Sequence, residues 1–234
     1  MRCMRMRVTS TAVLLLLVGV LGPAESFSQV TIDFDGLVGM VNVPGTVVPE
    51  ASRLSTELHA STGAVFSSGP NSFAAVVNVV GLPSDPNGIG GVDAQERLDY
   101  VAPITIAFFD PTDIGRPATT DFVSITSDTV PLGSGTFTLT AFDAAGVLLG
   151  TTTTPDDVGG KTISVSFPGI HSVEVSGTTG TVAFDNLTFN DIAAAVPLLS
   201  NWALGLLALG LVAAGAWLGR PGALVPALDR RGDL

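Results

Sequence analysis

The chain has 234 residues, a formal net charge of −11 and a mean hydropathy of +0.52. Apolar residues gather at its two ends, while residues 29–191 hold only four Lys or Arg against eighteen Asp or Glu. So acidic a segment repels a phosphate backbone, which excludes nucleic acid as an expected partner. The only cysteine, Cys3, precedes the first apolar run, so the acidic segment forms no disulfide.

Residues 1–28 have the three parts of a secretory signal peptide. A start with three arginines is followed by an apolar run over residues 12–21, expected to be helical, and then by small residues after a Gly-Pro break. Cleavage is expected after Ser26 or Ser28. The apolar run is shorter than the about 20 residues that cross a bilayer, which favours a cleaved signal over an anchor.

Residues 29–191 are expected to form an all-β domain. Short alternating or β-branched runs are separated by Gly, Pro, Asn and Asp, which is typical of a β-sandwich. The expected strands are 30–34, 72–80, 104–109, 121–127, 136–143, 147–153, 162–167, 171–176 and 181–189. Residues 144–146 predict a short hairpin turn, and residues 82–93 predict a long surface loop.

The later part of this domain resembles the closing half of jelly-roll-type domains found in exported proteins. The resemblance rests on residues 141–150, 169–175 and 182–189. It implies a jelly-roll-like β-sandwich, and it describes a scaffold more than an activity.

In domains of this shape a structural Ca²⁺ often joins the first strand to the last. The resemblance therefore implies four metal candidates, which lie near the start and the end of the domain: Asp33, Asp35, Asp185 and Asn186. Their side-chain oxygens are the hard ligands that Ca²⁺ prefers. The alternative is that Asp185 and Asn186 make only turn or strand-end hydrogen bonds.

No catalytic motif is found in the domain. His59 and His171 have no cysteine nearby and form no helical pair, which disfavours zinc. No Gly-x-Ser-x-Gly elbow presents a nucleophile, and residues 133–135 are expected to be a turn. A carboxylate pair for glycoside hydrolysis stays open, because its separation is set in space. Sugar stacking would need exposed aromatic rings, and the domain has one tyrosine, Tyr100, and no tryptophan.

The last part of the chain predicts a transmembrane helix over about residues 202–219. This segment has no charged residue and, with the apolar residues upstream, is long enough to cross a bilayer. Trp202 and Trp217 lie near its ends, where indole rings prefer the interface. Three basic residues follow it: Arg220, Arg230 and Arg231. The positive-inside bias then predicts a cytoplasmic C-terminus and an acidic domain on the outer side.

The segment before this helix reads Val196-Pro197-Leu198-Leu199-Ser200-Asn201-Trp202-Ala203. It resembles the C-terminal sorting signals of the PEP-CTERM class, most closely the IPTL variant, which reads Ile-Pro-Thr-Leu-Ser-x-Trp-Gly. Pro197, Leu199, Ser200 and Trp202 agree with that pattern, Val196 is a conservative change, and Leu198 replaces Thr. The resemblance implies recognition by an exosortase-type membrane protease, cleavage near residues 197–200, and release or surface attachment in a bacterium.

These features predict an exported β-sandwich protein that is membrane-anchored or surface-sorted. Residues 1–28 are the signal peptide, 29–191 the extracytoplasmic domain and 192–234 the sorting tail. A structural or binding role in the bacterial envelope or extracellular matrix is expected, with the membrane, the sorting protease and extracellular polysaccharide as partners. A carbohydrate-binding module and an extracellular hydrolase are the alternatives, and the lack of a catalytic motif disfavours the hydrolase.

Overall fold

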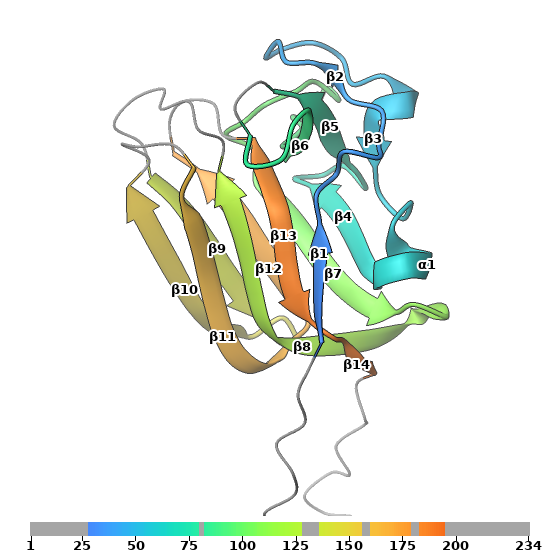
Figure 1. The fold of residues 1–234 in the computed structure, drawn as a ribbon, viewed down its shortest axis with the longest axis vertical. Helices are drawn as coiled ribbons and strands as arrows, with labels where there is room; N and C mark the ends of the chain where they lie inside the picture. Colours follow the sequence, from blue (N-terminus) through green and yellow to red (C-terminus); the bar gives the residue numbers. More distant parts are fainter. Residues whose placement is uncertain (1–27, 80–81, 128–135, 156–159, 179–182, 195–234) are drawn as a thin grey trace, which may run out of the picture. The chain divides into compact units, whose positions relative to one another are not determined.

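The computed structural model describes residues 28–79, 82–127, 136–155, 160–178 and 183–194. The described residues form two facing layers of β-strands, as Figure 1 shows. An all-β architecture is therefore confirmed for this part of the chain. The predicted signal peptide, transmembrane helix, sorting motif and 133–135 turn lie outside it. Within the described ranges, no helix is long and apolar enough to cross a membrane.

The first layer has the strand order β4-β7-β12-β9-β10, with antiparallel neighbours throughout. Its strands are β4 (Ala64–Ser68), β7 (Ile104–Asp110), β12 (Ser172–Gly177), β9 (Thr136–Phe142) and β10 (Leu148–Pro155). Residues in β9 alternate between buried and partly exposed, as the sequence predicts. The predicted turn is also confirmed, since the Asp143 N–H donates to the Val147 carbonyl at 3.0 Å.

The second layer is built around β13 (Phe184–Asn190). On one side of it lie β8 (Asp113–Ser127) and then β11 (Thr162–Ile170). On the other side it pairs with both β1 (Gln29–Ile32) and β6 (Asn87–Gly90). Next to β6 runs β5 (Ala74–Asn78), whose far edge carries β2 (Met40–Val41) and β3 (Arg53–Leu54). A last short strand, β14 (Ala193–Ala194), pairs with β8.

The main core lies between the layers and is tied together by phenylalanine pairs. Phe108 of β7 packs against Phe189 of β13 with 4.9 Å between ring centroids, and Phe137 of β9 packs against Phe184 of β13 at 5.8 Å. All four side chains are almost fully buried. Each such pair adds stability beyond its buried area, by about 0.5–1.5 kcal/mol.

A second, smaller core lies on the other face of β5. Ala74 and Val76 belong to the main core, whereas Ala75 and Val77 pack into the second one with Tyr100 and others. Because β5 is buried on both faces, its sequence is continuously apolar instead of alternating. This second core includes Met40 of β2, whereas Leu54 of β3 belongs to the main core. Two short helices, η1 (Glu50–Ser52) and α1 (His59–Thr62), lie on either side of β3 in the chain.

The prediction of a surface loop over residues 82–93 is wrong, because this stretch contains the buried strand β6. Its glycines are required by close packing. A Cβ at Gly88 would lie 2.7 Å from the Phe184 carbonyl oxygen, and one at Gly90 would lie 2.9 Å from Leu98 Cδ1. These glycines, which suggest a loop in the sequence, thus allow β6 to pack closely against its neighbours in the sheet. The sequence also failed to predict β2, β3, β4 and the short helices.

The start of β1 lies beside the end of β13 (Figure 1). The Ser28 hydroxyl donates to Asp191 Oδ2 at 2.6 Å, and the Asp191 N–H donates to the Ser28 carbonyl at 2.8 Å. The domain thus begins and ends at one end of the sandwich. The elements β2, β3, β5 and β6 lie toward the opposite end.

Candidate functional site

An open pocket lies where η1, β3 and the approach to β5 meet. Its volume is about 380 Å³, within the range usual for small-molecule sites. Six residues line it: Glu50, Arg53, Ser55, Glu57, Ser72 and Phe73. Five of these are polar or charged, so the pocket offers hydrogen-bond donors and acceptors and little apolar surface.

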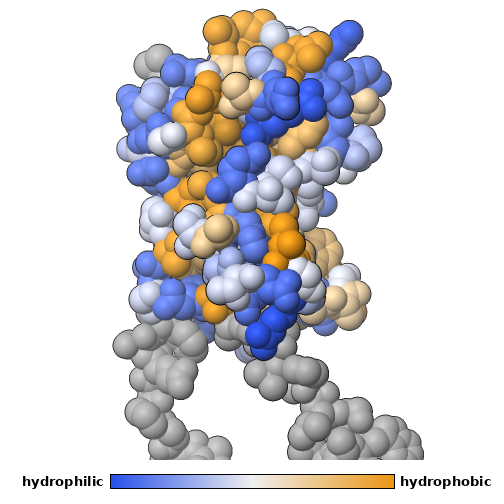
Figure 2. Space-filling view, turned by 90° about the vertical axis from the view of Figure 1, so that its right-hand side faces the viewer, coloured by the Kyte–Doolittle hydropathy of each residue, from blue (hydrophilic) through white to orange (hydrophobic). Residues whose placement is uncertain are grey.

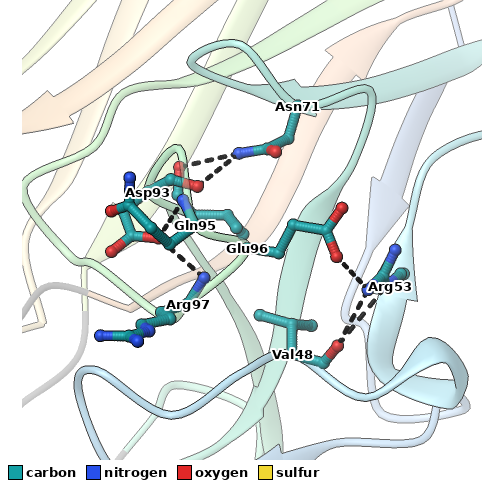
Figure 3. Close-up of polar contacts among 8 residues, drawn as sticks. Val48, Arg53, Asn71, Asp93, Gln95, Glu96 and Arg97 are labelled. Atoms are coloured by element: carbon teal, nitrogen blue, oxygen red, sulfur yellow. Dashed lines mark hydrogen bonds and ion pairs between the residues drawn. The ribbon is translucent and has the colours of Figure 1, made fainter.

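Arg53 is the best-fixed side chain of this pocket. Its Nη2 forms an ion pair with Glu96 at 2.6 Å, and both Nε and Nη2 lie 3.4 Å from the Val48 carbonyl (Figure 3). Its guanidinium carbon lies 4.3 Å from the centroid of the Phe73 ring. Contacts on three sides hold this long side chain in one orientation, which lowers the entropy cost of using it to bind a ligand.

Glu96, the ion-pair partner, has an unusual backbone conformation. Its φ is +59°, in a region that residues other than glycine adopt only at a cost of about 1–3 kcal/mol. Asp93 holds this turn, because its Oδ1 accepts the N–H groups of Gln95 and Arg97, each at 2.8 Å. Asn71 Nδ2 donates to the Asp93 carbonyl at 2.7 Å and ties the turn to the start of β5. The turn thus places the Glu96 carboxylate on Arg53.

The other wall of the pocket carries two serines and two glutamates. The Ser55 hydroxyl donates to the Ser72 carbonyl at 2.7 Å, and a Glu57 carboxylate oxygen accepts the Ser55 N–H. Glu50 lies in η1, and both glutamates are exposed to solvent. The pocket therefore combines one fixed cation with two solvent-accessible carboxylates, an arrangement that suits a ligand rich in hydroxyl groups.

The four predicted calcium ligands come from the two ends of the described domain. Two of them, Asp185 and Asn186, meet at Ser84, whose hydroxyl donates to Asp185 Oδ2 at 2.8 Å and lies 3.5 Å from Asn186 Oδ1. Asp35 Oδ1 accepts the Asn87 N–H nearby at 3.2 Å. Asp33 contributes its carbonyl, 3.3 Å from the Ser84 hydroxyl, while its own Oδ1 faces the Asp35 N–H at 3.3 Å.

Asp185 is fully buried, which is unusual for a carboxylate. Burial raises the pKa of Asp185 above its ordinary value, and the Asp35 charge adds to the rise. Hydrogen bonds from the Ser84 N–H and hydroxyl and from the Asn186 N–H oppose this shift of the pKa. Asp185 and Asn186 thus contact Ser84, which is more than a hundred positions away in the chain, and both the calcium site and its alternative stay predictions.

Among the described residues, no group of three or more His, Cys, Asp or Glu side chains is arranged to hold a metal ion. A site at Asp35 and Asp185 would need oxygens from Ser84, Asn186 and the Asp33 carbonyl. Because the described side chains alone do not form a metal site, the calcium site stays a prediction.

The histidines lie apart from the pocket. His171 Nδ1 lies 2.9 Å from the Ala118 carbonyl, and its ring meets Phe109 edge-on with 5.3 Å between centroids. His59 begins α1, and its Nε2 is buried with no hydrogen-bond partner among the described residues. Tyr100, considered above for sugar stacking, is only 4% exposed and donates to Asn42. It is part of the second core and cannot stack on a sugar.

Figure 2 shows orange atoms at the end of the domain that carries β2 and also further along the same face, mixed with blue ones. The described large hydrophobic side chains that are exposed before β7 in the chain are all valines: Val38, Val41, Val43, Val47 and Val101. Charged and polar groups lie among them, so the end of the domain opposite to its termini is a mixed surface.

Comparison with known proteins finds no matching family model and no matching curated protein. Solved structures with a similar arrangement include a DUF4465 family protein from Bacteroides caccae, at 12% identity and a TM-score of 0.36, which covers 69% of this chain and 98% of that one. A xylan-binding domain from CBM 22 matches at 16% identity and a TM-score of 0.31, covering 63% and 97%.

The CBM51-2 and INT domains of ZmpB from Clostridium perfringens match at 13% identity and a TM-score of 0.28, over 66% of this chain and 29% of that one. These likenesses concern the β-strand arrangement alone. At such identities and TM-scores they carry no argument about what this chain binds.

The pocket residues were not predicted from the sequence. Arg53 and Glu96 are 43 positions apart, and neither belongs to a known motif. One signal of such a pair was present in the composition. Residues 29–191 have four Lys or Arg and eighteen Asp or Glu, so an acidic partner is expected near each basic residue.

Proposed function

We propose that this chain is an exported β-sandwich protein of the bacterial envelope or extracellular matrix, anchored or sorted by its C-terminal tail, with a binding role. The signal-like start and the sorting motif support export, and the pocket beside Arg53 supports binding. The lack of a catalytic motif disfavours a hydrolase, and the single tyrosine and missing tryptophan of residues 29–191 disfavour a carbohydrate-binding module that stacks aromatic rings on sugars.

The observation that carries this proposal is the position of the folded domain between the two predicted signals. Its first paired strand begins at Gln29, directly after the expected cleavage sites, and its last ends at Ala194. The sorting motif begins two positions further on, at Val196. Cleavage after Ser26 or Ser28 and near residues 197–200 would leave every described strand intact, including β14.

The described domain begins and ends at one end of the sandwich, where Ser28 and Asp191 are bonded. Strand β3, which carries Arg53 of the pocket, lies toward the other end. The proposed binding surface is thus separate from the end of the domain at which the described chain begins and ends.

The test is expression of the full chain, with an epitope inserted after Asp143 in the β9–β10 turn, in a bacterium that has an exosortase-type system. Protease added to spheroplasts is expected to digest the tagged domain and leave a cytoplasmic control protein intact. Pro197→Ala, in the sorting motif, is expected to accumulate as uncut precursor, whereas the matched change Pro221→Ala is processed normally. A domain protected from protease would contradict export.

A further inference from the structure

The pocket beside Arg53 has the chemistry of a saccharide site. Sugar hydroxyls donate to carboxylates and accept from guanidinium groups, and the pocket presents both within one volume of about 380 Å³. This volume lies at the small end of the usual range, so it suits a short stretch of a glycan.

The charges of the pocket select among saccharides. Glu50 and Glu57 are acidic, and the one basic side chain, Arg53, is already paired with Glu96. The domain around them is strongly acidic as well. A glycan that carries uronic acid or phosphate groups would therefore be repelled, whereas an uncharged glycan would not.

Stacking on an aromatic ring contributes little here. Phe73 is only 7% exposed, and the Arg53 guanidinium covers its ring. Recognition would depend on hydrogen bonds from side chains that are already oriented, with Arg53 fixed by Glu96, the Val48 carbonyl and Phe73. The strained backbone of Glu96 is consistent with such a role, since strain of this kind persists where the surrounding structure enforces it and clusters at active sites, ligand clamps and switch regions.

We propose that the pocket formed by Glu50, Arg53, Ser55, Glu57, Ser72 and Phe73 binds an uncharged, hydroxyl-rich glycan. Glu50 and Glu57 accept the sugar hydroxyls, and Arg53 donates to them. This inference rests on the proposed function only in that export places the domain among extracellular polysaccharides.

Isothermal titration calorimetry on the full chain in detergent tests it, with four probes: cellohexaose, xylohexaose, maltohexaose and an oligogalacturonate. At least one neutral probe is expected to bind, and the oligogalacturonate is expected to bind more weakly than that probe. The double change Glu50→Gln and Glu57→Gln should weaken binding about tenfold or more, because a neutral amide oxygen replaces each charged acceptor. Both side chains are exposed, and the amide oxygen introduced by Glu57→Gln keeps an acceptor for the Ser55 N–H, so these substitutions leave the fold intact.

The matched control is Glu174→Gln, in β12 of the other layer, which should leave binding unchanged. No heat with any neutral probe, or binding that the double variant does not weaken, would overturn the proposal, and stronger binding of the oligogalacturonate would overturn its charge assignment. These outcomes do not depend on where the cell places the protein. Failure of binding therefore rejects the pocket as a glycan site and leaves export standing, while a protein that stays in the cytoplasm rejects export and leaves the pocket standing.

Discussion

The Arg53 guanidinium lies over the Phe73 ring, with 4.3 Å between the guanidinium carbon and the ring centroid. The same guanidinium pairs with Glu96 from a turn that lies 43 positions later. One side chain thus joins the second core, the pocket and the strained turn, which makes it the residue whose removal is most informative.

Arg53→Ala is expected to lower the free energy of unfolding by about 1–2 kcal/mol, through loss of the cation–π contact and of a partly exposed ion pair. Urea unfolding followed by circular dichroism measures this change. Arg116→Ala is the matched control, because Arg116 forms an exposed ion pair with Asp110 at 3.2 Å. It should change stability by no more than about 0.5 kcal/mol. Equal losses for the two variants would show that the Phe73 contact contributes nothing.

The glycines of β6 are expected to be intolerant of any side chain. Gly88→Ala would place a Cβ 2.7 Å from the Phe184 carbonyl oxygen, and the resulting strain should cost about 1–3 kcal/mol. Gly36→Ala is the control, since a Cβ there meets nothing within 4 Å. Its stability should stay within about 0.5 kcal/mol of wild type. A Gly88→Ala variant as stable as Gly36→Ala would contradict the placement of β6 beside β13.

Two aspartates, Asp185 and Asp110, should make the free energy of unfolding depend on pH in opposite directions. The measurement is made in buffer with a chelator. Burial raises the pKa of Asp185, so its contribution is fully present below the ordinary pKa of 3.8 and is lost as the pH rises through the folded pKa. Hydrogen bonds from Thr112 lower the pKa of Asp110, so its contribution is present above 3.8 and is lost as the pH falls through the folded pKa.

Urea unfolding of wild type, Asp185→Asn and Asp110→Asn across this acidic range isolates the two contributions. The stability difference between wild type and Asp185→Asn should fall as the pH rises, and the corresponding difference for Asp110→Asn should fall as the pH decreases. Slopes of the same sign would show that Asp185 is not buried as described.

The predicted calcium site has a clear thermal signature. If Asp35, Asp185 and Asn186 bind Ca²⁺ with Ser84, the melting temperature should rise when calcium replaces the chelator, because a ligand of the folded state alone stabilises it. Asp35→Asn should abolish this rise, whereas Asp113→Asn, at the exposed start of β8, should preserve it. Equal melting temperatures with calcium and with chelator would reject the site.

The parts of the fold that sequence reasoning predicted are those where local pattern and tertiary environment agree. The strand β9 has one buried and one partly exposed face, so its residues alternate, and Gly146 of the following turn has the positive φ of +75° that glycine favours. The strand β6 was missed because its composition reads as loop, while its strand structure depends on β5 and Phe184.

The candidate site was less predictable still. The predicted metal residues do converge on Ser84, because β1 and β13 are neighbours. The pocket depends on Arg53, Glu96 and Phe73, which come from three separate segments. These three residues come into contact because short elements pack around the second core, and no local sequence pattern predicts that contact.

The proposed function requires that both ends of the chain are sorting segments around one folded domain. Intact mass spectrometry of the protein recovered from the cell surface or the culture medium tests this claim most directly. A mature chain that begins at Phe27 or Gln29 and ends near residues 197–200 is predicted. A recovered chain that still carries residues 1–28, or residues 202–219, would contradict sorting by removal of these segments.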